Sequence, residues 1–445
     1  MIPALFARRA AYFALLGLSA VANIDAAAAH APPYGTGLLF PDTGDELPLV
    51  LTNRGLLFPG PLGYALRCTL AYGASTAEES RGLLADDGRI VVQSSAGVFS
   101  SLDQGCTFSR APGLPPGPLA TFATSADRQR LLTSTAGYAE AGQVYVSEDG
   151  ALGFRALLTL PDKSDVEAMV VAPSRAARVY ASGKRLDGNV LRDTWLVSDD
   201  GGRSFARTDV PRKRSPIGVH PRNADAVLVA EREVDTSVTT LLRSADGGKT
   251  FQHVREVPSV LAFASSADGA RSWIGTGVGS DDLRGGLFVS NDDGATFEPI
   301  RDELLAVTCL ASRGPRLWMC GSVAPGIGGV WSQEDEATPL VAQLRFDHVV
   351  TPLDCPGELD STLGGQCEGD FRDWLTEQVG TAGDAGADAG TPTGPRSHAT
   401  NGCALHAGQP SPQSAPPRVT AWCSLLGVYA LWRAMRGTFV RPRGR

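Results

Sequence analysis

Serine and aspartate recur two residues apart at five places in the chain, which puts a hydroxyl and a carboxylate close together each time. The five segments, called the SxD turns below, are 101–108, 147–154, 198–205, 244–251 and 290–297, and begin with Ser101, Ser147, Ser198, Ser244 and Ser290. Glycoside hydrolases use two carboxylates about 5 to 10 Å apart. Five aspartates are therefore candidate catalytic carboxylates: Asp103, Asp149, Asp200, Asp246 and Asp292.

The same segments have a purely structural explanation. Each follows a short β-rich run, so it begins where a strand ends. Serine and aspartate side chains can accept hydrogen bonds from the backbone N–H groups of such a turn, and glycine supplies its positive φ. The matching glycines are Gly105, Gly202, Gly248 and Gly294, and the closing aromatic residues are Phe108, Phe154, Phe205, Phe251 and Phe297. We therefore predict that these residues hold turns on the rim of the fold, away from any catalytic centre.

The spacing of the turns predicts the fold. Their serines are 46, 51, 46 and 46 residues apart, and a repeat of that length with several short strands is typical of a β-propeller. Residues 37–73 lack the turn but offer four strands of their own. We predict an all-β fold, with seven four-stranded blades in one domain over residues 32–347; six or eight blades remain alternatives.

The pattern SxDxGxTF resembles the Asp-box of sialidase-like and sortilin-type propellers. The copy at 147–154 departs from it, with Ala151 in place of glycine and Gly153 in place of threonine. A sialidase would need three converging arginines, the first in an RIP-like motif near the start of the propeller. The nearest arginines, Arg54 and Arg67, lie in TNRGL and ALRCT instead. The resemblance therefore implies the fold, and we do not expect sialidase activity.

Charge and composition argue against several other classes. The net charge is −8, so the single basic run at 211–214 does not predict a nucleic-acid partner. The cysteines lack CxxC spacing and no histidine cluster accompanies them, so we expect neither a zinc site nor a cofactor.

The two ends of the chain predict export. Residues 1–31 are predicted to be a signal peptide, with Arg8 and Arg9 before an apolar stretch.

The end of the chain is predicted to contain three segments. They are a small disulfide-stapled helical segment at 348–379, a disordered Gly/Ala/Pro/Asp-rich linker at 380–417, and an apolar segment with an arginine-rich tail at 418–445. Together with Cys403 the end resembles the myxobacterial C-terminal sorting tail. This resemblance implies processing at Cys403 and display at the cell surface, with membrane contact through the tail; an interfacial helix on a secreted protein is the alternative.

Cysteine usage agrees with an oxidising compartment. Cys309 and Cys320 flank a short loop and would face each other in a hairpin, so we predict a disulfide between them. We further predict a bridge between Cys355 and Cys367, and consider one between Cys68 and Cys106.

Long loops between the second and third strand of successive blades are the candidate recognition surface. They are 184–193, 232–239, 277–286 and 322–329, and equivalent loops of a closed propeller gather on one face. We therefore expect a monomeric binding or scaffold propeller for a glycan, peptide or protein. The alternative is a secreted carbohydrate-active enzyme with catalytic carboxylates that the sequence does not reveal.

Overall fold

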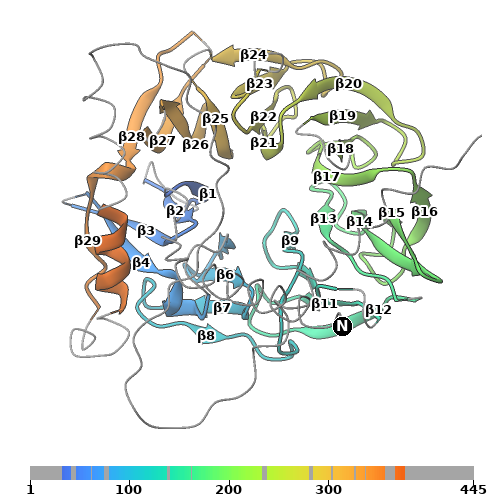
Figure 1. The fold of residues 1–445 in the computed structure, drawn as a ribbon, viewed down its shortest axis with the longest axis horizontal. Helices are drawn as coiled ribbons and strands as arrows, with labels where there is room; N and C mark the ends of the chain where they lie inside the picture. The colour runs from blue at the N-terminus through green and yellow to red at the C-terminus, as the bar shows by residue number, and fades with distance from the viewer. Residues whose placement is uncertain are drawn as a thin grey trace, which may run out of the picture. The chain divides into compact units, whose positions relative to one another are not determined.

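A computed structural model describes residues 33–375 except 42–46, 62, 75–79, 138–140, 162, 233–237, 280–283, 302–303, 325–326, 336 and 356–365. The predicted signal peptide, linker and apolar tail, with Cys403, lie outside these residues. Across the described part of the chain, seven antiparallel sheets stand side by side in a ring, as Figure 1 shows. The prediction of an all-β propeller with seven four-stranded blades is confirmed.

The blades follow one another in chain order. Blade 1 contains β1 (Gly35–Leu39), β2 (Leu49–Thr52), β3 (Gly55–Gly60) and β4 (Gly63–Cys68). Blade 2 contains β5 (Arg81–Leu84), β6 (Ile90–Ser94), β7 (Gly97–Ser101) and β8 (Ser109–Arg110). Blade 3 contains β9 (Ala123–Thr124), β10 (Leu131–Ser134), β11 (Gln143–Ser147) and β12 (Arg155–Thr159). Blade 4 contains β13 (Ala168–Val171), β14 (Val179–Asp187), β15 (Val190–Ser198) and β16 (Ala206–Val210).

The remaining blades have the same order. Blade 5 contains β17 (Lys213–Val219), β18 (Val227–Arg232), β19 (Thr239–Ser244) and β20 (Gln252–Val257). Blade 6 contains β21 (Val260–Ser265), β22 (Ser272–Thr276), β23 (Leu287–Ser290) and β24 (Glu298–Arg301). Blade 7 contains β25 (Ala306–Arg313), β26 (Arg316–Ala324), β27 (Ile327–Gln333) and β28 (Val341–Arg345). The short 3₁₀ helices η1 (Thr69–Tyr72) and η2 (Phe346–His348) follow the first and last blades, and β29 (Val349–Pro352) comes after η2.

The strands form where apolar and β-branched residues can be buried between neighbouring blades. The middle strand β6 is buried along its whole length, whereas the outer strand β16 is almost entirely exposed. The core is therefore a series of layers, each shared by two blades. Between blades 4 and 5, for example, the Trp195 ring lies edge-on to Phe251, with centroids 5.4 Å apart. The closing aromatic residue of an SxD turn thus helps to join one blade to the next.

The ring closes at blade 1, whose sheet combines four strands from the N-terminal part of the chain with β29 from its C-terminal part. Blade 1 consists of N-terminal strands, and β29 pairs in parallel with its outer strand β4. The inner strands of blades 7 and 1 meet directly, where the Thr308 hydroxyl donates a 2.6 Å hydrogen bond to the carbonyl oxygen of Gly35. The C-terminal segment therefore adds a fifth strand to blade 1.

Among the described residues, the cysteines form three disulfides. The predicted bridge between Cys309 and Cys320 is confirmed, because these residues are register partners on β25 and β26. The other predicted pairs are wrong: Cys68 bonds to Cys367, and Cys106 bonds to Cys355. Parallel pairing of β29 with β4 brings the C-terminal segment beside blades 1 and 2, so both of its cysteines bond to the propeller and not to each other.

The segment after the propeller contains a strand that was not predicted, β29, and a helix over 366–375. Trp374 of this helix is 1% exposed and its indole N–H donates a 2.8 Å hydrogen bond to the carbonyl oxygen of Phe346. Phe371 and Trp374 share one apolar cluster with residues of blades 1 and 7. No helix in the described part of the chain is long and apolar enough to cross a bilayer.

Candidate functional site

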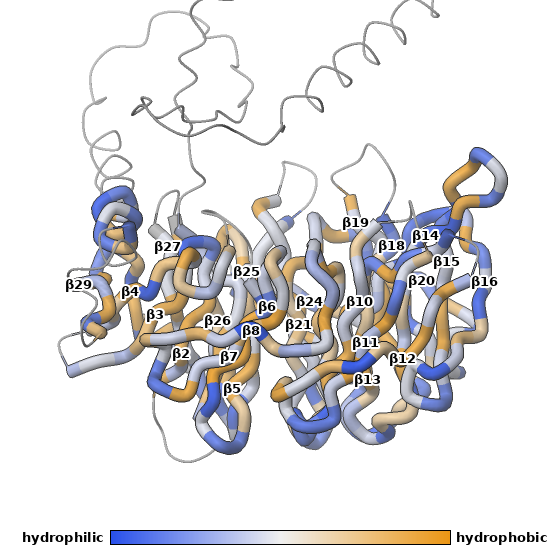
Figure 2. Tube along the Cα trace, turned by 90° about the horizontal axis from the view of Figure 1, so that it is seen from below, coloured by the Kyte–Doolittle hydropathy of each residue, from blue (hydrophilic) through white to orange (hydrophobic). Residues whose placement is uncertain are grey.

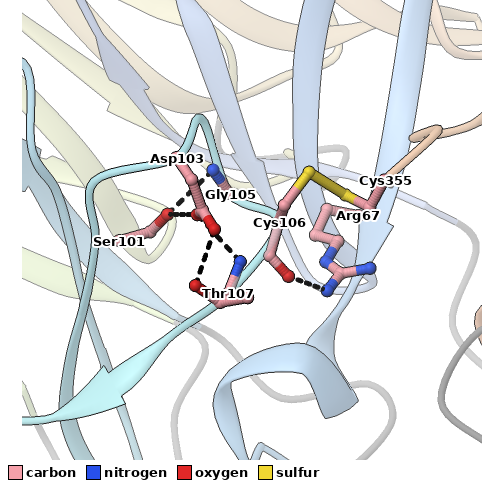
Figure 3. Close-up of a disulfide and its surroundings, with 7 residues drawn as sticks. All are labelled: Arg67, Ser101, Asp103, Gly105, Cys106, Thr107 and Cys355. Carbon is pink, nitrogen blue, oxygen red and sulfur yellow. Dashed lines mark hydrogen bonds between the residues drawn. A yellow bond between two sulfur atoms is a disulfide. The ribbon is translucent and has the colours of Figure 1, made fainter. Parts of the chain in front are cut away.

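The SxD turns lie between the third and fourth strands of blades 2 to 6. In the first of them, the Ser101 hydroxyl accepts the Gly105 N–H at 2.9 Å and donates to Asp103 at 2.8 Å. The same carboxylate accepts the Thr107 N–H at 2.8 Å and its hydroxyl at 2.6 Å (Figure 3). Both carboxylate oxygens are therefore occupied within the turn.

The same hydrogen bonds recur in three other turns. They join Ser198, Asp200 and Ser204, then Ser244, Asp246 and Thr250, then Ser290, Asp292 and Thr296. In the divergent turn, Asp149 accepts only the serine hydroxyl and backbone N–H groups, because Gly153 has no hydroxyl. Ala151 of this turn has a positive φ of 72°, which costs energy for a residue with a Cβ.

These hydrogen bonds favour the ionised carboxylate. Slight burial raises the pKa of Asp200, but the hydrogen bonds from Ser204 and Ser198 outweigh it and lower that pKa to about 2. Hydrogen bonds from the Thr250 side chain and backbone likewise lower the pKa of Asp246. Such a carboxylate is a poor proton donor near neutral pH, so these aspartates hold turns.

Three arginines reach from one blade into the SxD turn of the next blade, a contact that was not predicted from the sequence. Arg130 donates from Nη2 to the carbonyl oxygen of Gly201 at 2.6 Å, and Arg243 from Nε to that of Asp293 at 2.8 Å. Arg67 donates in the same way to the carbonyl oxygen of Cys106 (Figure 3). A repeated pattern in the sequence could have indicated this arrangement, because Arg89, Arg130, Arg178 and Arg271 each immediately precede the second strand of a blade.

The two arginines closest to the expected sialidase position lie inside the protein. Arg54 is 9% exposed and Arg67 is 2% exposed. Arg67 is directed towards the first SxD turn, as described above, and not towards the central channel. Both side chains are therefore buried in the part of the chain that the structure describes.

The strand order defines two faces of the ring. The SxD turns and the connections between the first and second strands lie on one face, which is called the turn face. The connections between the second and third strands lie on the other face, which is called the loop face.

Parts of the predicted recognition loops, 233–237, 280–283 and 325–326, are outside the described residues. The predicted loop 184–193 is mostly strand: β14 and β15 extend into a hairpin whose turn is at 188–189. In Figure 2 this hairpin rises from the rim of the ring, and its Val190 and Leu191 are 56% and 42% exposed.

A charged cluster lies at the base of this hairpin. Glu167 contacts the ammonium of Lys184 at 3.0 Å and that of Lys213 at 2.6 Å. Asp165 is 3% exposed and accepts the N–H of Lys184 at 2.8 Å. Burial raises the pKa of Asp165. Burial acts in the same direction on Glu167, but the two lysines outweigh it, so the pKa of Glu167 is lowered. Two carboxylates two residues apart therefore have opposite pKa shifts.

The basic run at 211–214 is neutralised by neighbouring carboxylates. Arg214 donates to Glu231 at 2.7 Å, and Arg212 lies 3.8 Å from the same carboxylate. Lys213 is paired with Glu167, as described above. These ion pairs explain why the run does not form a free basic patch.

A cavity of about 350 Å³ opens at the loop-face end of the central channel. Its lining comes from the beginnings of the inner strands of blades 1, 2, 6 and 7, and comprises Tyr34, Thr36, Ser80, Arg81, Leu261 and Thr308. Thr36 donates its hydroxyl proton to the carbonyl oxygen of Ser80 and Thr308 to that of Gly35. Within the described residues, the side chain of Arg81 is exposed and makes neither a hydrogen bond nor an ion pair.

The turn-face end of the channel has a different character. A cavity of about 420 Å³ there is lined by the ends of the inner strands of blades 3 to 7, and contains Phe122, Met169, Val219, Phe263 and Leu310 among its lining. The lining residues include no acidic or basic side chain. Among the described residues, no group of three histidines, cysteines or carboxylates could hold a metal ion.

Of the comparisons with known proteins, the match to a family model supports a β-propeller. A family model described as sortilin, neurotensin receptor 3, matches residues 142–276. Comparison with curated protein sequences gave no match. Among solved structures, the chain is similar to the GH74 enzyme of Niastella koreensis, at 19% identity and a TM-score of 0.42, over 69% of this chain and 44% of the enzyme. This chain therefore corresponds to less than half of that enzyme.

The chain is also similar to two further solved structures. The oligogalacturonate lyase of Vibrio parahaemolyticus is 11% identical, with a TM-score of 0.45, over 68% of this chain and 89% of the lyase. The β-propeller domain of the trilobed protease of Pyrococcus furiosus is 14% identical, with a TM-score of 0.40, over 71% of this chain and 84% of that domain.

Proposed function

We propose that this protein is an exported binding propeller of the Asp-box type that recognises a glycan, peptide or protein through its loop face. The recurrent hydrogen bonds of the SxD turns support the Asp-box assignment. The carboxylates of those turns are occupied by turn hydrogen bonds on the opposite face. The observation that carries the proposal is the loop-face cavity of about 350 Å³, in which Arg81 has no partner among the described residues.

The cavity favours a ligand with an acidic group and hydroxyls. A guanidinium without a carboxylate partner attracts an anion and can donate two hydrogen bonds to it. Thr36 and Thr308 have already donated their hydroxyl protons, so their oxygens accept hydrogen bonds from a ligand. Leu261 is 48% exposed and offers an apolar surface beside them. An acidic glycan satisfies all three features.

Glycan-array binding tests this proposal. The exported protein should bind acidic glycans, and Arg81→Gln should weaken that binding at least tenfold. Arg175→Gln is the matched control, because it removes the same charge from a half-exposed arginine paired with Asp199 on the turn face. Binding to neutral glycans alone, or an equal effect of the two variants, would contradict an anion site at Arg81.

A carbohydrate-active enzyme is the second candidate, and one observation favours it. Asp165 has a raised pKa and the neighbouring Glu167 a lowered one, which is the combination that an acid and a base require. A screen against chromogenic glycosides tests this candidate. Hydrolysis that disappears in Asp165→Asn would establish it and overturn a binding-only role.

Export and display at the cell surface complete the proposal. The three disulfides among the described residues support an oxidising compartment, and the predicted signal peptide and the resemblance of the end of the chain to a sorting tail support surface anchoring. Protease treatment of intact cells should release the propeller. Recovery only from the culture medium would contradict anchoring.

A further inference from the structure

The C-terminal part of the described chain crosses from blade 7 back to blade 1. It consists of β29, residues 353–355 and the helix 366–375, and is called the strap below. Its contacts with the propeller are β29 on β4, the bond of Cys355 to Cys106 in the first SxD turn, and the bond of Cys367 to Cys68 at the end of β4. Both disulfides join the strap to the first two blades, whereas its chain continues directly from blade 7.

The seam between blades 7 and 1 has no shared strand. Across it, the Phe40 ring lies edge-on to Trp318 with centroids 5.3 Å apart, and Thr308 donates to the carbonyl oxygen of Gly35. The apolar cluster at this seam includes Trp374 and Phe371 of the strap together with Phe346 and Trp318 of the last blade. The strap therefore contributes side chains to the core of the junction between the last blade and the first.

We propose that the two strap disulfides form a redox-controlled latch that keeps the ring closed at this seam. They span 299 and 249 residues, and they tie the strap, which follows blade 7, to blade 1 and to blade 2. The third disulfide spans only 11 residues within blade 7 and joins no two blades. Reduction of both strap disulfides leaves the seam held by noncovalent contacts alone, while each blade keeps its own sheet.

A dithiol reductant can open the latch by thiol–disulfide exchange. Its thiolate attacks one sulfur to form a mixed disulfide, and its second thiol then displaces the protein cysteine. Each protein disulfide gains two electrons and two protons, and the reductant becomes a cyclic disulfide. Cys106 is half-buried, whereas the cysteines of the other two bridges are at most 5% exposed. The bond between Cys106 and Cys355 is therefore the accessible starting point.

Opening the seam would also disturb the proposed recognition site. The loop-face cavity takes Thr36 from blade 1 and Thr308 from blade 7, so it crosses the seam. If the proposed function holds, ligand binding at Arg81 depends on the latch being oxidised. The latch itself rests only on the contacts of the strap and the seam, and its test requires no ligand.

Hydroxyl-radical footprinting of the full-length protein tests the latch. The folded, oxidised protein is treated with dithiothreitol, alkylated, and compared with protein that was alkylated without reduction. Phe40 and Trp318 report on the seam, and Tyr180 and Trp195, which are at most 2% exposed between blades 4 and 5, report on the rest of the ring. We expect labelling of the two seam residues to rise at least fivefold and that of the other two to change less than twofold.

Paired variants separate the latch from general destabilisation. Cys106→Ser with Cys355→Ser, or Cys68→Ser with Cys367→Ser, leaves one strap disulfide and should keep the seam protected. The four substitutions together should expose it. The latch would be overturned if reduction raised the labelling of all four reporter residues equally, or raised the labelling of none of them. Because this comparison uses the folded wild-type protein, it gives an answer even if the fourfold variant does not fold.

Discussion

Arg130 in blade 3 donates a 2.6 Å hydrogen bond from Nη2 to the carbonyl oxygen of Gly201, which lies in the SxD turn of blade 4. The contact links neighbouring blades at the turn face. Similar contacts from Arg67 and Arg243 show that the turns are joined to the preceding blade as well as closed by their own hydrogen bonds.

Replacing this arginine should destabilise the propeller. Arg130→Met retains much of the apolar stem but leaves the Gly201 carbonyl without this donor, and loss of a hydrogen bond to a charged group costs about 1.5 to 3 kcal/mol. Arg155→Met is the control, because Arg155 is 55% exposed and paired only at the surface with Glu148. The control should change the free energy of unfolding by less than about 0.5 kcal/mol. Equal free-energy losses in urea denaturation would contradict the role assigned to Arg130.

The carboxylate of Asp200 should make stability depend on acid pH. Its pKa falls from 3.8 to about 2 in the folded state, so its contribution is complete above about pH 4 and is lost as the pH falls through 2. Asp200→Asn should therefore show a smaller fall in Tm between pH 4 and pH 2 than the wild type. Glu298→Gln, which changes a carboxylate that is 75% exposed, should follow the wild-type curve.

Two glycines of the turns should respond differently to a methyl group. Gly202 has a φ of 86°, and the atoms nearest to an added Cβ are 3.5 Å away, so Gly202→Ala adds backbone strain of about 1 to 2 kcal/mol. At Gly105 the added Cβ would lie 2.3 Å from the Phe58 ring. Gly105→Ala should therefore reduce the free energy of unfolding more than Gly202→Ala does. Denaturant titration of both variants measures the difference, and the opposite order would contradict this account.

The buried carboxylate of Asp165 should reduce stability at neutral pH. Its pKa is raised by burial, so its favourable contribution is present when it is protonated and is lost as the pH rises above its ordinary value of 3.8. Asp165→Asn keeps an oxygen that can accept the Lys184 N–H but cannot ionise. We expect this variant to have a higher Tm than the wild type at pH 7, and the two to converge near pH 3. A lower Tm at pH 7 would show that the charge is stabilised by its neighbours.

The blade count could be predicted because each blade repeats a local pattern. The serine spacing and the β-rich runs are properties of short segments, and blade 1 followed from its length even without an SxD turn. The hydrogen bonds of Ser101 and Asp103 are local in the same sense. Their residue types and separation therefore indicated the contacts.

The bridges of Cys68 and Cys106 could not be predicted in this way. Their partners are Cys367 and Cys355, and these pairs come together only after seven blades have curved into a ring and β29 has paired with β4. Pairing by proximity along the chain therefore failed for four cysteines and worked for Cys309 with Cys320. Arg81 is a similar case, because the walls of its cavity come from four separate blades.

Closure by a strap has a consequence for how such a chain can evolve. Where a final blade combines strands from both ends, a duplication must preserve the fit of that composite sheet. Here the four repeat strands of blade 1 lie within the first part of the chain, and the residues that fasten the ring lie in blades 1 and 2 and in the strap. A duplicated or deleted blade in the middle of the chain would change the circumference and leave the fastening residues intact, which makes this architecture permissive to changes in repeat number.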